Sequence, residues 1–384
     1  MIWHVLDVRA VWIKEFAAAL SAQAATLGWC PQITGTGMFR DSESETMLSD
    51  PELRVRHFPL QRGFAKFPVN VIAREADRIS RRIRKRTERP VDSVLVCTSP
   101  HYAPVAERWP GLIVYYVTDL FVAYGDNPAF VKALDRRLCD AAHLVCPNSE
   151  RIAEYLIQRA GCEAEKVTII SNATRGANVL AAPSFHSTLE VPADVRDLPK
   201  PLAGVIGNLA DNTDWIMLEE VIARVPWLSW FFVGPTEMEV SDSRQRDARH
   251  RLKILGGRVR FLGAKRYSQL QDYARALDVA VLPYRKCEPT YSGSATRFYE
   301  HLAACRPIIA TRGSAELLKK EPLLRLSDST DEMTLALEEL RVAEFRDGHE
   351  TLRWTASQTE TWDDRASIMR NALNKQIARD REAA

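Results

Sequence analysis

The sequence predicts an α/β protein made of two domains, each with its own parallel sheet. At 384 residues the chain is longer than one ordinary hydrophobic core requires and long enough for two. Short β-branched runs alternate with amphipathic helical patterns in both halves, which is typical of parallel strands joined by crossover helices. A proline-containing stretch with little periodicity, residues 183–200, separates the halves and predicts a linker.

In the first half, amphipathic stretches at 11–27 and 128–141 predict helices. Ser149, followed by Arg-Ile-Ala-Glu, predicts the N-cap of a further helix. The expected strands are Trp3–Leu6, Ser93–Cys97, Leu112–Tyr116, Leu144–Cys146 and Val167–Ile170.

The alternating pattern restarts after the linker, and a helical segment ends the chain. The expected domains are residues 1–182 and 201–352, followed by a C-terminal helix at 353–384 that packs back on the first domain. Ligands of such proteins usually bind outside the carboxyl ends of the strands. The expected strands of the second half are Ala203–Ile206, Leu228–Val233, Val259–Leu262, Val279–Leu282 and Ile308–Thr311.

Composition excludes several classes of protein. Apolar residues make up 46% and charged residues 27%, which is typical of a globular chain. No apolar run reaches the roughly 20 residues of a membrane-spanning helix. Charged residues interrupt the N-terminus, so no signal peptide is expected and the predicted location is the cytoplasm. The seven scattered cysteines include no C-x-x-C pair and predict neither a zinc site nor a disulfide framework.

A basic stretch, Arg74–Arg89, stands out from the near-neutral net charge of +2. Two interpretations remain open for it. It is either a solvated helix face or a surface for an anionic membrane or acceptor. Nucleic acid is not expected, because no aromatic side chains are interleaved with these charges.

The most informative stretch runs from Val279 to Thr311. A strand is followed by Pro-Tyr-Arg-Lys at 283–286, a polar loop at 290–296, and then Arg297-Phe-Tyr-Glu300. A Ser/Gly/Thr-rich loop that opens a helix presents unpaired N–H groups and the positive end of the helix dipole, which suits a diphosphate. Taken alone, the pattern also fits Thr296 as an ordinary N-cap with a surface pair beyond it.

This stretch, with the following Leu-Ala-Ala-x-x-Pro-Ile-Ile-Ala-Thr, resembles the donor-site signature of GT-B glycosyltransferases of bacterial polysaccharide biosynthesis. Arg297 stands where those enzymes usually have Lys, and Cys305 where they usually have Gly. The segments 205–215, 232–235 and 261–263 are similar to the family's first three strand ends of the nucleotide domain. Segments 115–119 and 145–149 resemble its N-terminal half.

The resemblance implies two Rossmann-like domains facing each other across a cleft. It implies a nucleotide diphosphate sugar on the second domain, UDP favoured over GDP, and a saccharide or lipid-linked saccharide acceptor on the first. The catalytic candidates are Asp119 and Arg297. The implied donor-binding residues are Gly207, Asn208, Gly234, Gly263, Tyr284, Arg285, Ser294, Thr296, Arg297 and Glu300. Glu300 would take the ribose.

One position departs from the retaining members of the family. Many of them carry a second Glu seven residues before the one matched by Glu300, and here that position is Gly293. The pattern Val-Tyr-x-x-x-Asp, which ends at Asp119, resembles inverting glucuronosyltransferase-like enzymes in which the Asp deprotonates the acceptor. Asp119 as a helix or turn cap is the other interpretation, and Asp7 and His4 are further candidates for the base.

Three functions are therefore carried forward. The first is transfer of a hexosyl or glucuronosyl group without a metal ion, since the sequence contains no D-x-D motif. The second is a nucleotide-sugar epimerase of the same fold, and the third is a non-catalytic binding subunit. No Walker, G-x-S-x-G or H-E-x-x-H pattern points to other chemistry.

Overall fold

The structure is a computed structural model that describes residues 1–34, 53–63, 69–85, 89–124, 127–183 and 191–383. Residues 184–190 of the expected linker and 86–88 of the basic stretch lie outside this set. The chain forms two compact units. The first contains Met1–Asn172, Ser292–Ser294 and Trp362–Ala384, and the second contains Ala173–Tyr291 and Ala295–Thr361.

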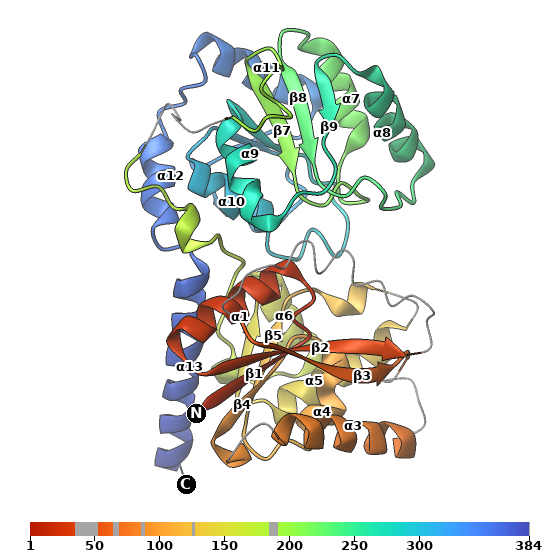
Figure 1. Cartoon of the computed structure of the whole chain (residues 1–384), viewed down its shortest axis with the longest axis vertical. Coiled ribbons are helices and arrows are strands. Elements are labelled where there is room, and N and C mark those ends of the chain that lie inside the picture. The colour runs from red at the N-terminus through yellow and green to blue at the C-terminus, as the bar shows by residue number, and fades with distance from the viewer. Residues whose placement is uncertain (35–52, 64–68, 86–88, 125–126, 184–190, 384) are drawn as a thin grey trace. The chain divides into compact units, whose positions relative to one another are not determined.

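The first unit holds a six-stranded parallel sheet in the order β3-β2-β1-β4-β5-β6 (Figure 1). Its central strands are almost entirely apolar, as expected for strands covered on both faces. The strands are β1 Ile2–Leu6, β2 Thr26–Thr34, β3 Val55–Gln61, β4 Ser93–Cys97, β5 Leu112–Val117 and β6 Leu144–Pro147. The helices are α1 Val11–Gln23, α3 Val69–Arg84, α4 Ala103–Ala106, α5 Pro128–Ala141, α6 Glu150–Tyr155 and α13 Trp362–Ala383.

Helices cover both faces of this sheet. On one face, α1 packs against α13, and the Phe16 ring lies 4.9 Å from the Tyr116 ring of β5. On the other face, α3, α4, α5 and α6 bury residues such as Ile79 and Leu138 in one apolar cluster. The predicted N-cap of α6 is confirmed, since Ser149 Oγ accepts a hydrogen bond from Ile152 N at 3.2 Å.

Four of the five strands predicted for the first half are confirmed with shifts of one residue or none. The strand predicted at Val167–Ile170 is wrong, because only a single bridge links Val167 to Val145. The strands β2 and β3 were not predicted. The helix expected to reach residue 27 ends at Gln23, and β2 begins three residues later.

The second unit holds another six-stranded parallel sheet, in the order β12-β11-β10-β7-β8-β9. Helices α9 and α10 cover one face and α7, α8 and α11 the other, each with its own apolar cluster. All five predicted strands are present, and only the two-residue β12 was not predicted. The strands are β7 Leu202–Ile206, β8 Ser229–Val233, β9 Val259–Phe261, β10 Val279–Leu282, β11 Ile308–Ala310 and β12 Arg325–Leu326. The helices are α7 Trp215–Arg224, α8 Ser243–Leu255, α9 Leu270–Ala276, α10 Thr296–Ala304, α11 Thr330–Val342 and α12 Glu350–Ser357.

The boundaries of the units differ from the expected domains. The second unit begins at Ala173, ahead of the expected linker. The described end of that linker belongs to the second unit, because Val195 and Leu198 are buried in its core. The expected single C-terminal helix is two helices, of which α12 belongs to the second unit and α13 to the first.

Candidate functional site

The strand order of the second unit reverses between β7 and β10, which lie side by side. The loops that follow two such strands diverge, and ligands of open α/β sheets bind in the crevice that results. Gly207 directly follows β7, Tyr284 follows β10, and α10 begins after the next loop. Most of the predicted donor-binding residues therefore belong to the carboxyl edge of one sheet.

Arg297, in the first turn of α10, lies buried at this switch point with only 7% of its surface exposed. Its Nη2 donates to the carbonyl oxygen of Asn208, and its guanidinium lies over the Tyr284 ring at 5.1 Å. Its Nη1 is buried without a hydrogen-bond partner among the described residues. No carboxylate of those residues forms an ion pair with it.

A buried cation without a counter-ion is unfavourable, and the neighbouring groups reflect this. Burial lowers the pKa of the Arg297 guanidinium and raises the pKa of the Tyr284 hydroxyl. His301 lies one turn further along α10 and is also buried. Burial, with the charge of Arg297 as a smaller cause, lowers the pKa of His301 to about 3, so this imidazole is neutral. An anion at Arg297 would neutralise this buried charge.

Three predicted glycines meet at this edge of the sheet. Gly207 N donates to the carbonyl of Val233 at 2.8 Å, and Gly234 N donates to the carbonyl of Gly263 at 2.9 Å. All three have positive φ. A Cβ at Gly207 would lie 2.7 Å from Arg297 Nε, and one at Gly234 would lie 1.8 Å from the Gly207 carbonyl oxygen. Glycine is needed at both positions for the edge to pack as it does.

The start of α10 is less open than the sequence suggests. Ala295 N donates to Glu316 Oε2 at 2.6 Å, so a carboxylate occupies one amide expected to face the diphosphate. Glu316 Oε1 accepts from the Tyr299 hydroxyl. Ser294, expected beside Thr296 at the diphosphate, belongs to the first unit, where its hydroxyl accepts from Asn172 N at 3.0 Å. The hydrogen-bonding capacity left for an anion here therefore lies in the Arg297 side chain more than in the helix end.

Glu300 follows Arg297 by one turn and is also buried. Its Oε1 accepts a hydrogen bond from the Tyr267 hydroxyl. Its Oε2 accepts from Thr174 Oγ1 at 3.2 Å and from Asn178 Nδ2 at 3.1 Å. The sequence pattern does not reveal these three donors, because only the folded chain brings 174–178 and 267 to α10.

Arg285, another predicted donor-binding residue, has partners of its own in the second unit. Its Nη2 is 3.3 Å from Asp242 Oδ2, and its Nη1 donates to the carbonyl of Asp211. Asp242 is the N-cap of α8 and accepts from Arg244 N at 2.9 Å. Arg285 therefore joins the loop after β7 to the start of α8.

In the first unit, Asp119 follows β5 at the carboxyl edge of the sheet. Its Oδ1 accepts a weak hydrogen bond from the Tyr124 hydroxyl at 3.4 Å. Burial raises the pKa of Asp119 to about 6, and the bond from Tyr124 opposes this shift. Asp119 does not cap a helix by any hydrogen bond of its side chain among the described residues. A carboxylate with a pKa near neutrality is suited to a general base.

The two further candidates for the base have structural partners. His4 is fully buried and its Nδ1 accepts from Trp29 Nε1 at 3.1 Å, while burial lowers the pKa of His4 to about 4. Asp7 forms an ion pair with Arg9 and accepts from the Tyr102 hydroxyl at 3.1 Å. Of the three candidates for the base, Asp119 has the weakest side-chain hydrogen bonding.

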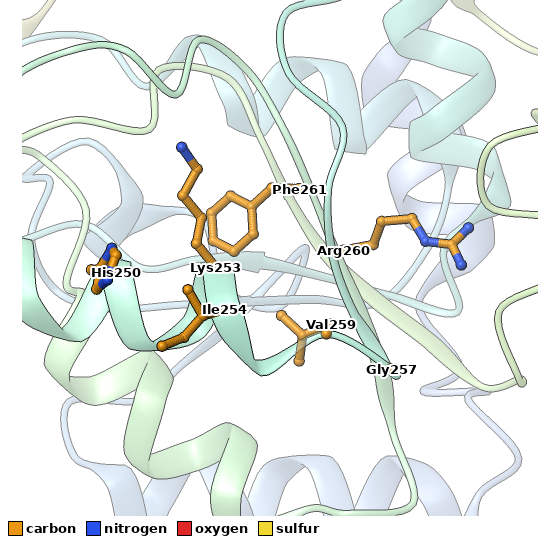
Figure 2. A pocket seen from close by; sticks show the side chains of 8 residues that line it. His250, Lys253, Ile254, Gly257, Val259, Arg260 and Phe261 are labelled. Carbon is orange, nitrogen blue, oxygen red and sulfur yellow. The ribbon is translucent and has the colours of Figure 1, made fainter.

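Within the described part of the chain, no group of three His, Cys, Asp or Glu residues is placed to hold a metal ion. No helix in that part is long and apolar enough to cross a bilayer. A pocket of about 620 Å³ lies elsewhere in the second unit, between the end of α8 and β9 (Figure 2). His250, Lys253 and Phe261 line it, and none of the predicted site residues does.

Comparison with known proteins supports this assignment of the fold. Residues 200–341 match the family model described as "Glycosyl transferases group 1". No curated protein matches the sequence.

Solved structures match over nearly the whole chain at low sequence identity. Anabaena HepE in complex with UDP-glucose is 16% identical with a TM-score of 0.68, covering 100% of both chains. Sucrose-phosphate synthase from Thermosynechococcus elongatus is 15% identical with a TM-score of 0.69, covering 98% of this chain and 99% of its own. An α,α-trehalose-phosphate synthase (UDP-forming) from Burkholderia xenovorans is 11% identical with a TM-score of 0.65, covering 97% and 99%. Residues 200–341 are therefore similar to group 1 glycosyl transferases, within a chain that has the GT-B fold.

Proposed function

We propose that the protein transfers a sugar from a nucleotide diphosphate sugar, UDP-linked, to a saccharide or lipid-linked saccharide in polysaccharide biosynthesis. The observation that carries this proposal is Arg297, a buried guanidinium with an unpaired Nη1 at the switch point of the second sheet. A diphosphate would supply the missing negative charge and accept charge-assisted hydrogen bonds worth about 1.5–3 kcal/mol each. The UDP-glucose bound by HepE supports UDP as the nucleotide.

In this proposal Arg297 has two roles. It holds the diphosphate in the bound donor, and it stabilises the charge that develops as the sugar–oxygen bond breaks and the diphosphate departs. His301 stays neutral beside it and adds no competing charge. No metal ion is assigned a role in the step. Glu300 would accept hydrogen bonds from the ribose hydroxyls.

Asp119 of the first unit is the proposed base that takes the proton of the acceptor hydroxyl. Its raised pKa, about 6, leaves it ionised near neutral pH and still basic enough to accept a proton. Because Gly293 stands where many retaining enzymes have a Glu, the proposal is a direct displacement with inversion at the anomeric carbon.

The first test measures UDP binding by calorimetry in wild type and Arg297→Ala. We expect the Kd for UDP to rise at least about 100-fold, since roughly two charge-assisted hydrogen bonds are lost. Arg251→Ala is the matched control, because Arg251 is an exposed arginine of the same unit paired with Glu219. Equal UDP affinity in Arg297→Ala and wild type would rule out this diphosphate site.

The alternatives are distinguished by their products. An epimerase would convert the UDP-sugar in buffer without any acceptor, whereas the proposed transferase requires an acceptor for sugar transfer. A binding subunit would bind UDP and show no turnover with any acceptor.

The proposal includes an anionic membrane surface as a partner of the first unit, near a lipid-linked acceptor. On α3, Arg78 and Arg82 donate to the carbonyls of Pro59 and His57 and so lie along the outer edge of β3. Seven exposed cations on or beside α3 and β3 form no ion pair with any described residue. These are Arg54, Arg56, Arg62, Arg74, Arg81, Arg82 and Lys85.

Each such cation near an anionic bilayer contributes about 1 kcal/mol of attraction at moderate salt. We expect the protein to co-sediment with vesicles containing phosphatidylglycerol and to dissociate as salt rises. Charge reversal of Arg74 and Arg81 to Glu should abolish the binding, while the same reversal at Arg244 and Arg246 on α8 should leave it intact. Equal binding to neutral and anionic vesicles would refute this surface.

A further inference from the structure

The site that Glu300 would offer to a ribose is filled by the chain's own side chains. Thr174 Oγ1 and Asn178 Nδ2 both donate to Glu300 Oε2, and Asn178 Nδ2 also lies 3.3 Å from Thr174 Oγ1. The 2′ and 3′ hydroxyls of a ribose are two neighbouring donors of the same kind. A carboxylate has about four acceptor positions, and a protein donor and a ribose hydroxyl cannot occupy the same one.

The two donors belong to the first residues of the second unit. Thr174 N donates to the carbonyl of Glu360 at 3.0 Å, and Arg275 Nη2 donates to the carbonyl of Asn178 at 2.8 Å. The segment 173–178 is therefore held by backbone contacts to its neighbours and by side-chain contacts to α10. Only the side-chain contacts involve Glu300.

We propose that Thr174 and Asn178 are internal competitors of the donor's ribose at Glu300. When a UDP-sugar binds, its ribose hydroxyls replace these two donors, and the side chains of segment 173–178 leave α10. The inference rests on the proposed function, since it places the ribose one helical turn from the diphosphate at Arg297. The exchange breaks and forms only hydrogen bonds. Because the bonds from Thr174 and Asn178 to Glu300 must break before the ribose can bind, they lower the affinity for the UDP-sugar.

The test compares UDP with 2′,3′-dideoxy-UDP by calorimetry in wild type, Asn178→Ala and Thr174→Val. We expect Asn178→Ala to bind UDP about tenfold more tightly than wild type, because a competing hydrogen bond to a charged group is gone. Thr174→Val should also bind UDP more tightly than wild type. Thr174→Ser, which keeps the hydroxyl, should bind UDP with the wild-type affinity. Affinity for dideoxy-UDP, which has no hydroxyls to exchange, should be the same in all four proteins.

Unchanged or weaker UDP affinity in both variants, with melting temperatures showing that they are folded, would overturn the inference. Amide hydrogen exchange gives a second readout in the wild-type protein. UDP should accelerate exchange of the Asn178 side-chain amide protons, which lose Glu300 as their acceptor, and slower exchange of those protons would also overturn the inference. Failure of wild type to bind either UDP or dideoxy-UDP would instead refute the proposed function itself.

Discussion

At Gly207 the backbone has a φ of 126°, and the space where a side chain would begin is taken by Arg297. Gly207→Ala would add backbone strain of about 1–3 kcal/mol and push the guanidinium away from the switch point. We expect the Kd for UDP to rise at least tenfold, measured by calorimetry. Gly161→Ala is the control, because Gly161 also has a positive φ but nothing lies within 4 Å of its Cβ position. It should lower the melting temperature without changing UDP affinity.

Asp119 gives the proposed reaction a specific pH dependence. The carboxyl must be ionised to accept a proton, so kcat/KM should fall as the pH is lowered through about 6, with a slope of one. Asp119→Asn should abolish transfer and keep the wild-type Kd for UDP. A flat profile between pH 5 and 8, or transfer by Asp119→Asn, would contradict the assignment.

Single residues also show the limit of what the sequence could predict. Arg297 could be recognised from the sequence because it stands three residues before Glu300, as the basic residue of the family signature does. The helix that carries both residues comes after a strand and the Pro-Tyr pair that directly follows it. The absence of a counter-ion for Arg297 could not be predicted from the sequence, because it depends on which carboxylates the fold brings near the guanidinium. Glu316 illustrates the same limit: it lies far along the chain and reaches Ala295 only through the return of β11.

Among whole elements, the buried parallel strands were the most predictable, because burial on both faces requires continuous apolar runs. The edge strand β3 was missed, since it carries Arg56, His57 and Pro59 among its apolar residues. Its neighbour β2 was missed because the preceding helical pattern continues into it without a break. Edge and near-edge strands are less buried, and their sequences are correspondingly less regular.

Helix α13 should be essential to the first unit, because it packs against α1 on one face of the sheet (Figure 1). Leu373 of α13 is fully buried, so Leu373→Ala should cost about 2–5 kcal/mol of unfolding free energy. Lys375→Ala, on the exposed side of the same helix, should cost almost nothing. Thermal unfolding in the presence of UDP is the measurement. Leu373→Ala should lower the melting temperature of the first unit, which is the unfolding transition that UDP does not shift. A decrease confined to the transition that UDP stabilises would contradict the prediction.

On the scale of the whole molecule, the sequence predicted two α/β units but placed their boundary by the prolines of 183–200. The structure begins the second unit at Ala173 instead, because segment 173–178 is bonded to Glu300 and Arg275. Proline content marks where helices and strands cannot continue, and it does not report which core a loop packs against. Val195 and Leu198 lie inside the expected linker and are nevertheless buried in the core of the second unit.

The assignment of α13 to the first unit has a consequence for how the protein is made. When β6 has been translated, all six strands of the first sheet have been synthesised, but α13, which packs against α1, has not. The second unit is translated in full before that helix emerges. The first unit therefore cannot complete its fold until after the second unit has been synthesised, in contrast to the N-terminal-first order usual during synthesis.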